Sequence, residues 1–162
     1  MLKFLKVITN IVVLALFILI TFFILAPFFG LKLYAVVSGS MEPGIPVGAL
    51  VAGRNVQAEE IVAGDVITFK VNPGSDTVAT HRVVEVNKAE GSFKTKGDNN
   101  EAADINPVKY SQLLGKVEYS LPYIGYFYYF LGTMIGKITM IIVFLSLIIL
   151  SVLLEKLMEK RE

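Results

Sequence analysis

The sequence predicts a mainly β domain flanked by two transmembrane α-helices, and three observations support this fold class. The 162 residues are 54% hydrophobic, and their mean hydropathy of +0.64 is too high for a soluble domain of this size. The apolar residues gather at both ends of the chain. The middle consists of short runs rich in Val, Ile, Thr and Phe, separated by Gly and other turn residues, which is typical of small β domains.

The first apolar segment follows a basic start. Lys3 and Lys6 precede a charge-free run over residues 7–31, which at about 1.5 Å per residue is longer than the roughly 30 Å hydrocarbon core of a bilayer. Residues 1–31 are therefore predicted to form a cytoplasmic tail and a first transmembrane helix, because basic residues favour the cytoplasmic side. A cleaved signal peptide is the alternative, but its apolar region is usually only about 7–15 residues long.

Residues 32–120 are predicted to form an extracytoplasmic β domain, with enough chain for one modest core. Residues 72–76, Asn-Pro-Gly-Ser-Asp, have the chemistry of a hairpin turn, and residues 96–100 form a second sharp turn. The predicted strands cover residues 33–37, 49–53, 65–71, 78–86, 92–96 and 114–119.

The C-terminal part begins with an aromatic segment. Residues 121–137 are rich in Tyr and Phe, which favour the headgroup level of a membrane, so this segment is predicted to lie at the membrane interface. Residues 138–154 are free of charge and predict a second transmembrane helix, which Lys137 can lengthen by extending outward. A buried or interfacial helix is the alternative. Residues 155–162 would be a second cytoplasmic tail, because Lys156, Lys160 and Arg161 match the basic start.

Composition also limits the possible partners and cofactors. The net charge is only +1, and the chain has one histidine and no cysteine. These values, with no basic stripe or zinc-ligand spacing, give no indication of a nucleic-acid partner. Without cysteine there is neither a disulfide framework nor a thiolate metal site. We therefore expect no nucleic acid, no metal and no organic cofactor.

The candidate nucleophile lies in residues 38–43, Ser-Gly-Ser-Met-Glu-Pro, where two hydroxyls flank a glycine and Pro43 and Pro46 prevent further regular structure. A serine hydroxyl is a weak nucleophile unless a base lies beside it, and the single histidine, His81, is the candidate base. Imidazole has a pKa near 6.5, whereas the pKa of a lysine would have to fall by about 3.4 to give a neutral base at pH 7. The short pattern alone would also fit a serine that forms a turn.

Three motifs occur together in a specific order: Ser-Gly-Ser-Met-Glu-Pro at 38–43, Thr-His-Arg-Val-Val at 80–84, and Lys-Gly-Asp-Asn at 96–99. In this combination the sequence resembles type I signal peptidases, the membrane-bound serine peptidases that remove signal peptides. It resembles most their endoplasmic-reticulum-type branch, which also occurs in archaea and some Gram-positive bacteria. The resemblance extends over nearly the whole chain and implies a signal-peptidase-type β fold for the catalytic domain.

The resemblance also implies roles for individual residues. Ser40 matches the family's nucleophile, and His81 takes the place that a lysine base occupies in the bacterial branch. Ser38 matches a position whose hydroxyl helps to form the oxyanion hole, beside the N–H of the nucleophile. Two aspartates match the acidic loop. Asp104 is expected to orient His81, with Asp98 as the alternative, and Asp98 is expected to bind the N–H groups of its own turn.

The function implied is a serine endopeptidase that hydrolyses one peptide bond in translocated preproteins. Its partners would be secretory preproteins, which lie extended beside a strand edge, the lipid bilayer and the translocation machinery. The location would be the cell membrane, or the endoplasmic reticulum membrane in a eukaryote, with both termini cytoplasmic and the catalytic domain outside. Two alternatives remain: a non-catalytic membrane-anchored β module that binds or assembles exported proteins, and a self-processing serine peptidase of the same broad fold.

Overall fold

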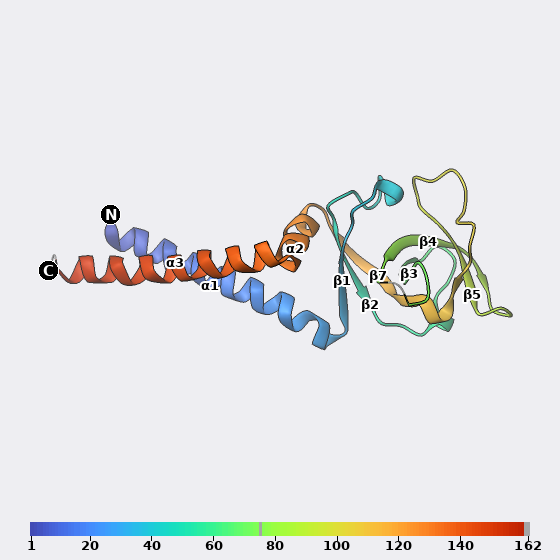
Figure 1. The fold of residues 1–162 in the computed structure, drawn as a ribbon, viewed down its shortest axis with the longest axis horizontal. Helices are drawn as coiled ribbons and strands as arrows, with labels where there is room; N and C mark the ends of the chain where they lie inside the picture. The colour runs from blue at the N-terminus through green and yellow to red at the C-terminus, as the bar shows by residue number, and fades with distance from the viewer. Residues whose placement is uncertain (75, 161–162) are drawn as a thin grey trace. The chain divides into compact units, whose positions relative to one another are not determined.

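The computed structural model describes residues 1–74 and 76–160 (Figure 1). Ser75 of the predicted hairpin turn and Arg161 of the predicted basic tail lie outside the described residues. Backbone contacts divide the chain into two compact units. One, here called the helical unit, joins Met1–Ala26 to the chain from Phe130 onward, and the other, the β unit, comprises Pro27–Tyr129.

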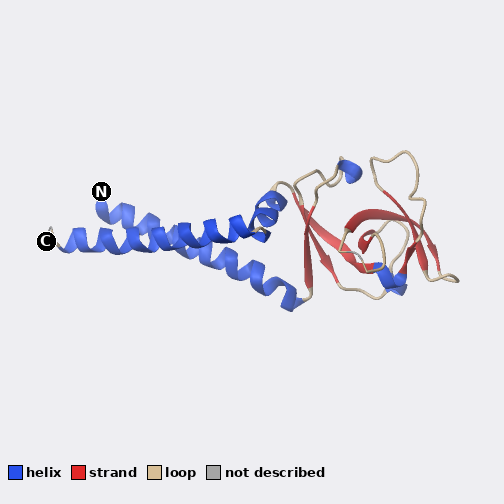
Figure 2. Ribbon diagram, in the orientation of Figure 1, coloured by secondary structure: helices blue, strands red, loops and turns tan. Residues whose placement is uncertain are grey.

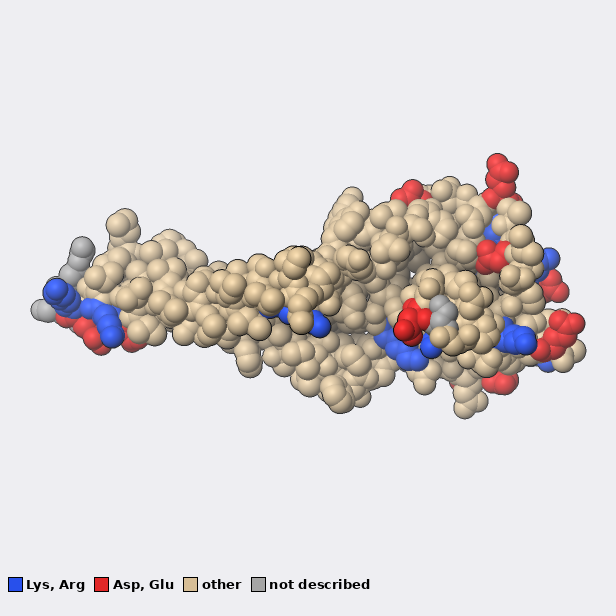
Figure 3. Space-filling model, viewed as in Figure 1, with Lys and Arg blue, Asp and Glu red and all other residues tan. Residues whose placement is uncertain are grey.

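The helical unit is built on two long helices, α1 (Leu2–Leu25) and α3 (Met134–Glu159), which pack against each other. The first apolar segment consists of α1 and the turn that follows it, Leu2–Phe29, and has a mean hydropathy of 3.0. The second is α3, with a mean hydropathy of 2.7, and both segments are long and apolar enough to cross a membrane. Charged side chains are sparse along these helices, whereas both signs are scattered over the visible face of the β unit (Figure 3). α3, Met134–Glu159, is longer than the predicted span of 138–154. The prediction stopped at the charged residues Lys137 and Glu155, and the helix includes both of them.

Polar side chains join α1 to α3 at two points. Ser151 Oγ donates a hydrogen bond of 2.6 Å to Asn10 Oδ1, and Lys6 forms an ion pair of 2.9 Å with Glu155. Hydrogen bonds between helices are favourable in a bilayer, which offers no water to replace them. These contacts bring the start of α1 and the end of α3 together.

The β unit contains one curled antiparallel sheet with the strand order β1-β2-β7-β3-β4-β5-β6 (Figure 2). A short helix, α2 (Ile124–Gly132), follows the last strand and lies within the predicted aromatic segment. The strands are β1 Leu31–Ala35, β2 Leu50–Arg54, β3 Val66–Lys70, β4 Val78–Asn87, β5 Ser92–Lys96, β6 Val108–Lys109 and β7 Leu113–Leu121.

The structure confirms the predicted fold class, and five of the six predicted strands have bounds that differ by one or two residues at one or both ends. β1 begins two residues before the predicted start, because Gly30 adopts a φ of +76° and turns the chain directly into the strand, a conformation that favours glycine. β6 was not predicted, since a two-residue strand is too short to show alternation. The strand at 92–96 has the predicted bounds.

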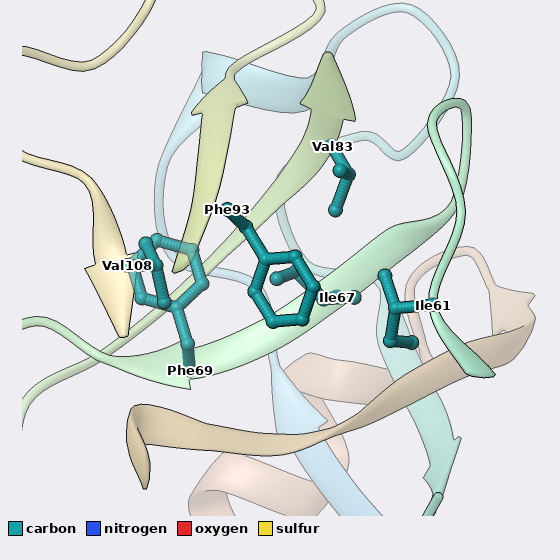
Figure 4. Close-up of a cluster of buried hydrophobic side chains, with 6 residues drawn as sticks. All are labelled: Ile61, Ile67, Phe69, Val83, Phe93 and Val108. Atoms are coloured by element: carbon teal, nitrogen blue, oxygen red, sulfur yellow. The ribbon is translucent and has the colours of Figure 1, made fainter. Parts of the chain in front are cut away.

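Two apolar clusters stabilise the sheet. The larger one joins strands β3 to β6 and the chain before β3, with side chains that interlock between the strands (Figure 4). Its buried members are Ile61, Ile67, Phe69, Val83, Phe93 and Val108. The smaller cluster consists of Met41, Ile45, Ala49 and Val51. Burial of one such large side chain contributes about 1.5–3 kcal/mol, so the smaller cluster fixes the segment that contains the candidate nucleophile.

Candidate active site

Ser40 lies in a single 3₁₀ turn, Gly39–Met41, which follows β1. Its neighbour Met41 is only 1% exposed and belongs to the smaller apolar cluster. Ser38, in extended conformation before the turn, has its Oγ 3.4 Å from Ser40 Oγ. The buried methionine thus anchors a turn on which both hydroxyls remain accessible.

His81 lies on β4 opposite Ile67 of β3. Its Nε2 is 3.2 Å from Ser40 Oγ, and its Nδ1 is 2.7 Å from Asp104 Oδ2. The ring meets that of Phe69 edge to face, with 6.1 Å between the ring centroids, and the histidine side chain is 14% exposed. The strand pairing and the aromatic contact therefore hold the imidazole between the hydroxyl and the carboxylate.

Asp104 lies in the loop between β5 and β6, and two contacts join it to Thr95 of β5. The N–H of Asp104 donates to the carbonyl oxygen of Thr95 at 2.8 Å, and Thr95 Oγ1 donates to Asp104 Oδ2 at 2.6 Å. Thr95 is completely buried. One carboxylate oxygen therefore accepts hydrogen bonds from the threonine hydroxyl and, when Nδ1 is protonated, from His81.

The structure places Asp98 away from His81, against Arg82. The carboxylate accepts hydrogen bonds from Arg82 Nε at 2.8 Å and from Nη2 at 2.7 Å, while Arg82 Nη1 donates to the carbonyl oxygen of Gly64 at 2.7 Å. The hydrogen bond with Asp98 raises the pKa of Arg82, so this arginine stays charged and ties two loops to β4.

The expectation that Asp98 binds the N–H groups of its own turn is wrong. The N–H of Asn100 donates to the carbonyl oxygen of Gly97 at 3.0 Å, and that of Asn99 donates to the carbonyl oxygen of Ser40 at 2.8 Å. Because both donors already have carbonyl partners, the carboxylate is left for Arg82.

The turn at 97–99 also supports the backbone of the candidate nucleophile. Besides its N–H contact, Asn99 donates from Nδ2 to the carbonyl oxygen of Gly39 at 3.2 Å. A Cβ on Gly97 would lie 2.6 Å from the Ser40 carbonyl oxygen, which is too close for any side chain. Glycine at this position is thus required for the turn to approach Ser40.

A groove of about 100 Å³ adjoins the two serines and His81. Its walls are the end of β1 with the residues that follow, and the start of β4. β5 pairs with β4 only from Arg82 onward, and among the described strands β1 pairs with β2 alone. Burial raises the pKa of Tyr34 in this groove, with a smaller effect from Tyr128, so the phenol stays neutral. The groove is therefore bordered by backbone with free pairing edges.

Sequence reasoning missed Thr95, Asn99 and the Arg82–Asp98 pair as parts of the site. A signal for Thr95 was present, because strand alternation puts it on the buried side with Phe93, where a hydroxyl requires a partner. The partners of Asn99 and Asp98 depend on how distant loops meet, which no local pattern indicates. Within the described residues, no group of three or more His, Cys, Asp or Glu side chains is arranged to hold a metal ion.

No protein-family model matches this chain, but curated proteins do. Signal peptidase I W of Bacillus subtilis strain 168 is 46% identical over 83 residues, which cover 49% of this chain and 43% of that protein. The human signal peptidase complex catalytic subunit SEC11C is 38% identical over 100 residues, covering 56% of this chain and 52% of the subunit. The subunit SEC11 of Colletotrichum graminicola is 33% identical over 102 residues, covering 56% and 58%.

The chain thus spans about half the length of the curated relatives it matches. Bacterial and eukaryotic signal peptidases both appear among them, and the eukaryotic ones are catalytic subunits by name. These similarities confirm the resemblance that the sequence motifs indicated. The chain is therefore similar to signal peptidase I of a bacterium and to catalytic subunits of eukaryotic signal peptidase complexes.

Proposed function

We propose that this protein is a membrane-bound serine endopeptidase that removes N-terminal signal peptides from translocated preproteins. Ser40 is the nucleophile, His81 the general base, and Asp104 the residue that orients the base. The observation that carries the proposal is the series of contacts from Ser40 Oγ to His81 Nε2, at 3.2 Å, and from His81 Nδ1 to Asp104 Oδ2, at 2.7 Å. An aligned hydroxyl, imidazole and carboxylate activate a serine for acyl transfer.

The reaction proceeds in two stages. Ser40 Oγ attacks the carbonyl carbon of the scissile bond while its proton passes to His81 Nε2, and the resulting imidazolium returns that proton to the leaving amine as the C–N bond breaks. Water then attacks the acyl-enzyme, again with His81 as base, and releases the acid product. The Ser38 hydroxyl, 3.4 Å from Ser40 Oγ, and the N–H of Ser40 are the donors for the oxyanion.

The groove supports a substrate that binds as an added strand. The free edges of β1 and of the first residues of β4 offer backbone donors and acceptors to an extended peptide. Val36, Val78 and Ala79 line a cavity of only about 100 Å³, which favours small side chains next to the scissile bond. The site therefore selects an extended segment with small residues ahead of the cut.

The proposed location is a membrane, crossed by α1 and α3, with the β unit on the outer side and both ends of the chain in the cytoplasm. Lys3 and Lys6 lie near the start of α1 and Lys156 and Lys160 near the end of α3, and basic residues favour the cytoplasmic side. The Lys6–Glu155 ion pair supports a common side for these ends. A protease site inserted between Asn72 and Asp76 should be cut only from outside, and cleavage only from inside would contradict this topology.

The test of function is cleavage of a preprotein by the detergent-solubilised protein, with N-terminal sequencing of the product. The wild type should release one mature product, cut after a small residue, and the Ser40→Ala variant should release none. The substitution removes the attacking oxygen and leaves the buried Met41 in place, so circular dichroism should report an unchanged fold. Cleavage by the purified alanine variant would contradict the proposal.

Covalent labelling separates this proposal from a β module that only binds exported proteins. A serine-directed phosphonate should react with Ser40 in the wild type and should not react in the Ser40→Ala or His81→Ala variants, because the attack needs both groups. Peptide mapping of the labelled protein identifies the residue. A protein that binds preprotein but takes up no label would be a binding module.

A further inference from the structure

The carboxylate of Asp104 is held by a residue that is not part of the nucleophile, the base or the oxyanion hole. Thr95 Oγ1 donates to Asp104 Oδ2 at 2.6 Å, and this is the oxygen that faces His81 Nδ1 at 2.7 Å. The backbone adds a second contact, from the Asp104 N–H to the Thr95 carbonyl oxygen at 2.8 Å. Thr95 thus binds Asp104 through both its side chain and its main chain.

The environment of Thr95 makes this contact specific. The residue is 0% exposed on β5, between Lys94 and Lys96, and it lies opposite Val83 of β4. A buried hydroxyl without a partner is costly, so the Thr95 hydroxyl is committed to the carboxylate. Because threonine is β-branched, its χ1 angle is restricted to few rotamers, and the hydroxyl donor has a nearly fixed position.

Asp104, in contrast, has space to turn. It borders a polar cavity of about 200 Å³, which lies beside β4 and β5. The charged groups that line this cavity with Asp104 are Glu85, Glu90 and Lys94. A carboxylate that lost its tether could rotate toward water or Lys94 and leave His81 without an acceptor.

We propose that Thr95 is a positioning residue, whose hydroxyl holds the Asp104 carboxylate in the orientation that faces His81. This inference rests on the proposed function, because orientation of the base matters only if His81 takes a proton from Ser40. Thr95, which directly precedes the Lys-Gly-Asp-Asn turn, thus has a role different from that of the turn. The turn supports the nucleophile, and Thr95 supports Asp104.

The test compares three variants in the preprotein cleavage assay. Thr95→Val removes the hydroxyl at nearly constant volume, and Thr95→Ser keeps it. Thr68→Val is the matched control, because Thr68 is also buried, at 1% exposure, on the other strand next to β4, and its hydroxyl contacts that of Thr80 at 3.0 Å. We expect Thr95→Val to lower kcat by roughly tenfold to a hundredfold with KM unchanged. Thr95→Ser and Thr68→Val should stay within about twofold of wild type.

A second readout does not depend on activity. The chain has one histidine, so the ¹⁵N imidazole signals of labelled protein in detergent report His81 alone. A carboxylate held beside an imidazolium stabilises it, so the midpoint of this titration should fall in Thr95→Val and stay unchanged in Thr95→Ser and Thr68→Val. The nearby charged groups Glu85, Glu90 and Lys94 are present in all three variants, so they do not account for a difference in the midpoint between the variants.

The proposal requires both changes in Thr95→Val. A loss of kcat with an unchanged titration midpoint would overturn it, because the effect would then bypass the contact between Asp104 and His81. A changed midpoint with a normal kcat would also overturn it. If the wild type cleaves no preprotein, the proposed function fails, and the titration still tests the contact by itself.

Discussion

The helical unit and the β unit satisfy their backbones in different ways. In α1 and α3 the backbone hydrogen bonds lie within each helix, and only 6% of the residues in the most apolar window of each are buried in the protein. In the β unit, β3 buries three residues in succession, Ile67 to Phe69, yet β1 and the start of β4 have a partner strand on one side only. The helices form their backbone hydrogen bonds internally and expose apolar side chains. The sheet has a packed core, but some of its strand edges have no paired strand.

This difference indicates that the helical unit determines where the protein is located and that the β unit carries the proposed catalytic groups. A helix with every backbone group paired is suited to a medium without water, and its exposed apolar side chains need no protein partner there. A sheet with unpaired edges is suited to water or to another strand. The candidate nucleophile, base and aspartate all belong to the β unit, so we expect variants there to change turnover and variants between the helices to change only stability.

The largest effect after loss of the nucleophile should come from Asp104→Asn. An amide in place of the carboxylate no longer stabilises the imidazolium, and in the best-studied serine peptidase triad such a change costs about 10⁴ in kcat. The control is Asp98→Asn, which loosens the contact with Arg82 and should lower the unfolding temperature with a partial loss of activity. Preprotein cleavage by both folded variants would measure this. A dead Asp98→Asn enzyme beside an active Asp104→Asn enzyme would reverse the assignment.

Ser38→Ala should have the next largest effect. Loss of one donor to the oxyanion typically lowers kcat by 10²–10³, and the exposed hydroxyl is not needed for packing. Single-turnover cleavage measures the change in the chemical step. A loss as complete as that of Ser40→Ala would show that the roles of the two serines are exchanged.

Gly97→Ala tests the approach of the turn to Ser40. The added Cβ would lie 2.6 Å from the Ser40 carbonyl oxygen, so the turn or the nucleophile must move, and a misplacement of about 1 Å can cost on the order of 10² in rate. Gly132→Ala, at the end of α2, is the control, because its Cβ would have no neighbour within 4 Å. Equal kcat values for the two variants would mean that the turn does not position Ser40.

Ser151→Ala should have the smallest effect and should leave turnover unchanged. It removes the hydrogen bond to Asn10, and such bonds between membrane helices average about 0.6 kcal/mol. Unfolding of the helices in a denaturing detergent, followed by circular dichroism, measures the loss. A fall in kcat comparable to that of Gly97→Ala would contradict the expectation that contacts between the helices affect stability and not turnover.

Sequence patterns predicted the helices and most of the sheet for a physical reason. Long apolar runs and short β-branched runs are signals that each segment carries by itself, so the helices and strands such as Ser92–Lys96 follow from local chemistry. The two-residue strand β6 depends on the partner that β5 offers it. The length of α3 depends on whether residues such as Glu155 find a partner, which the neighbouring helix provides.

The site could be anticipated only as far as the motifs extend. The motifs named two serines, Ser38 and Ser40, with His81 and two aspartates. The structure brings four of these five side chains together, all but Asp98. What could not be predicted is the pairing of Asp98, because the competition between its own turn and Arg82 is decided by which N–H groups are already occupied. Thr95 lay within reach of sequence reasoning, since a polar residue on the buried side of a strand demands a partner.

Under the proposed function, the open edges beside Ser40 would also distinguish peptides by their state of folding. A segment that joins an edge must bring backbone N–H and C=O groups that are free, and residues inside a folded helix or sheet have already committed theirs. Small residues within a folded cargo domain would therefore escape the groove, however well their side chains fit it. Protection of the mature protein would then follow from the timing of its own folding rather than from the rarity of suitable sequences.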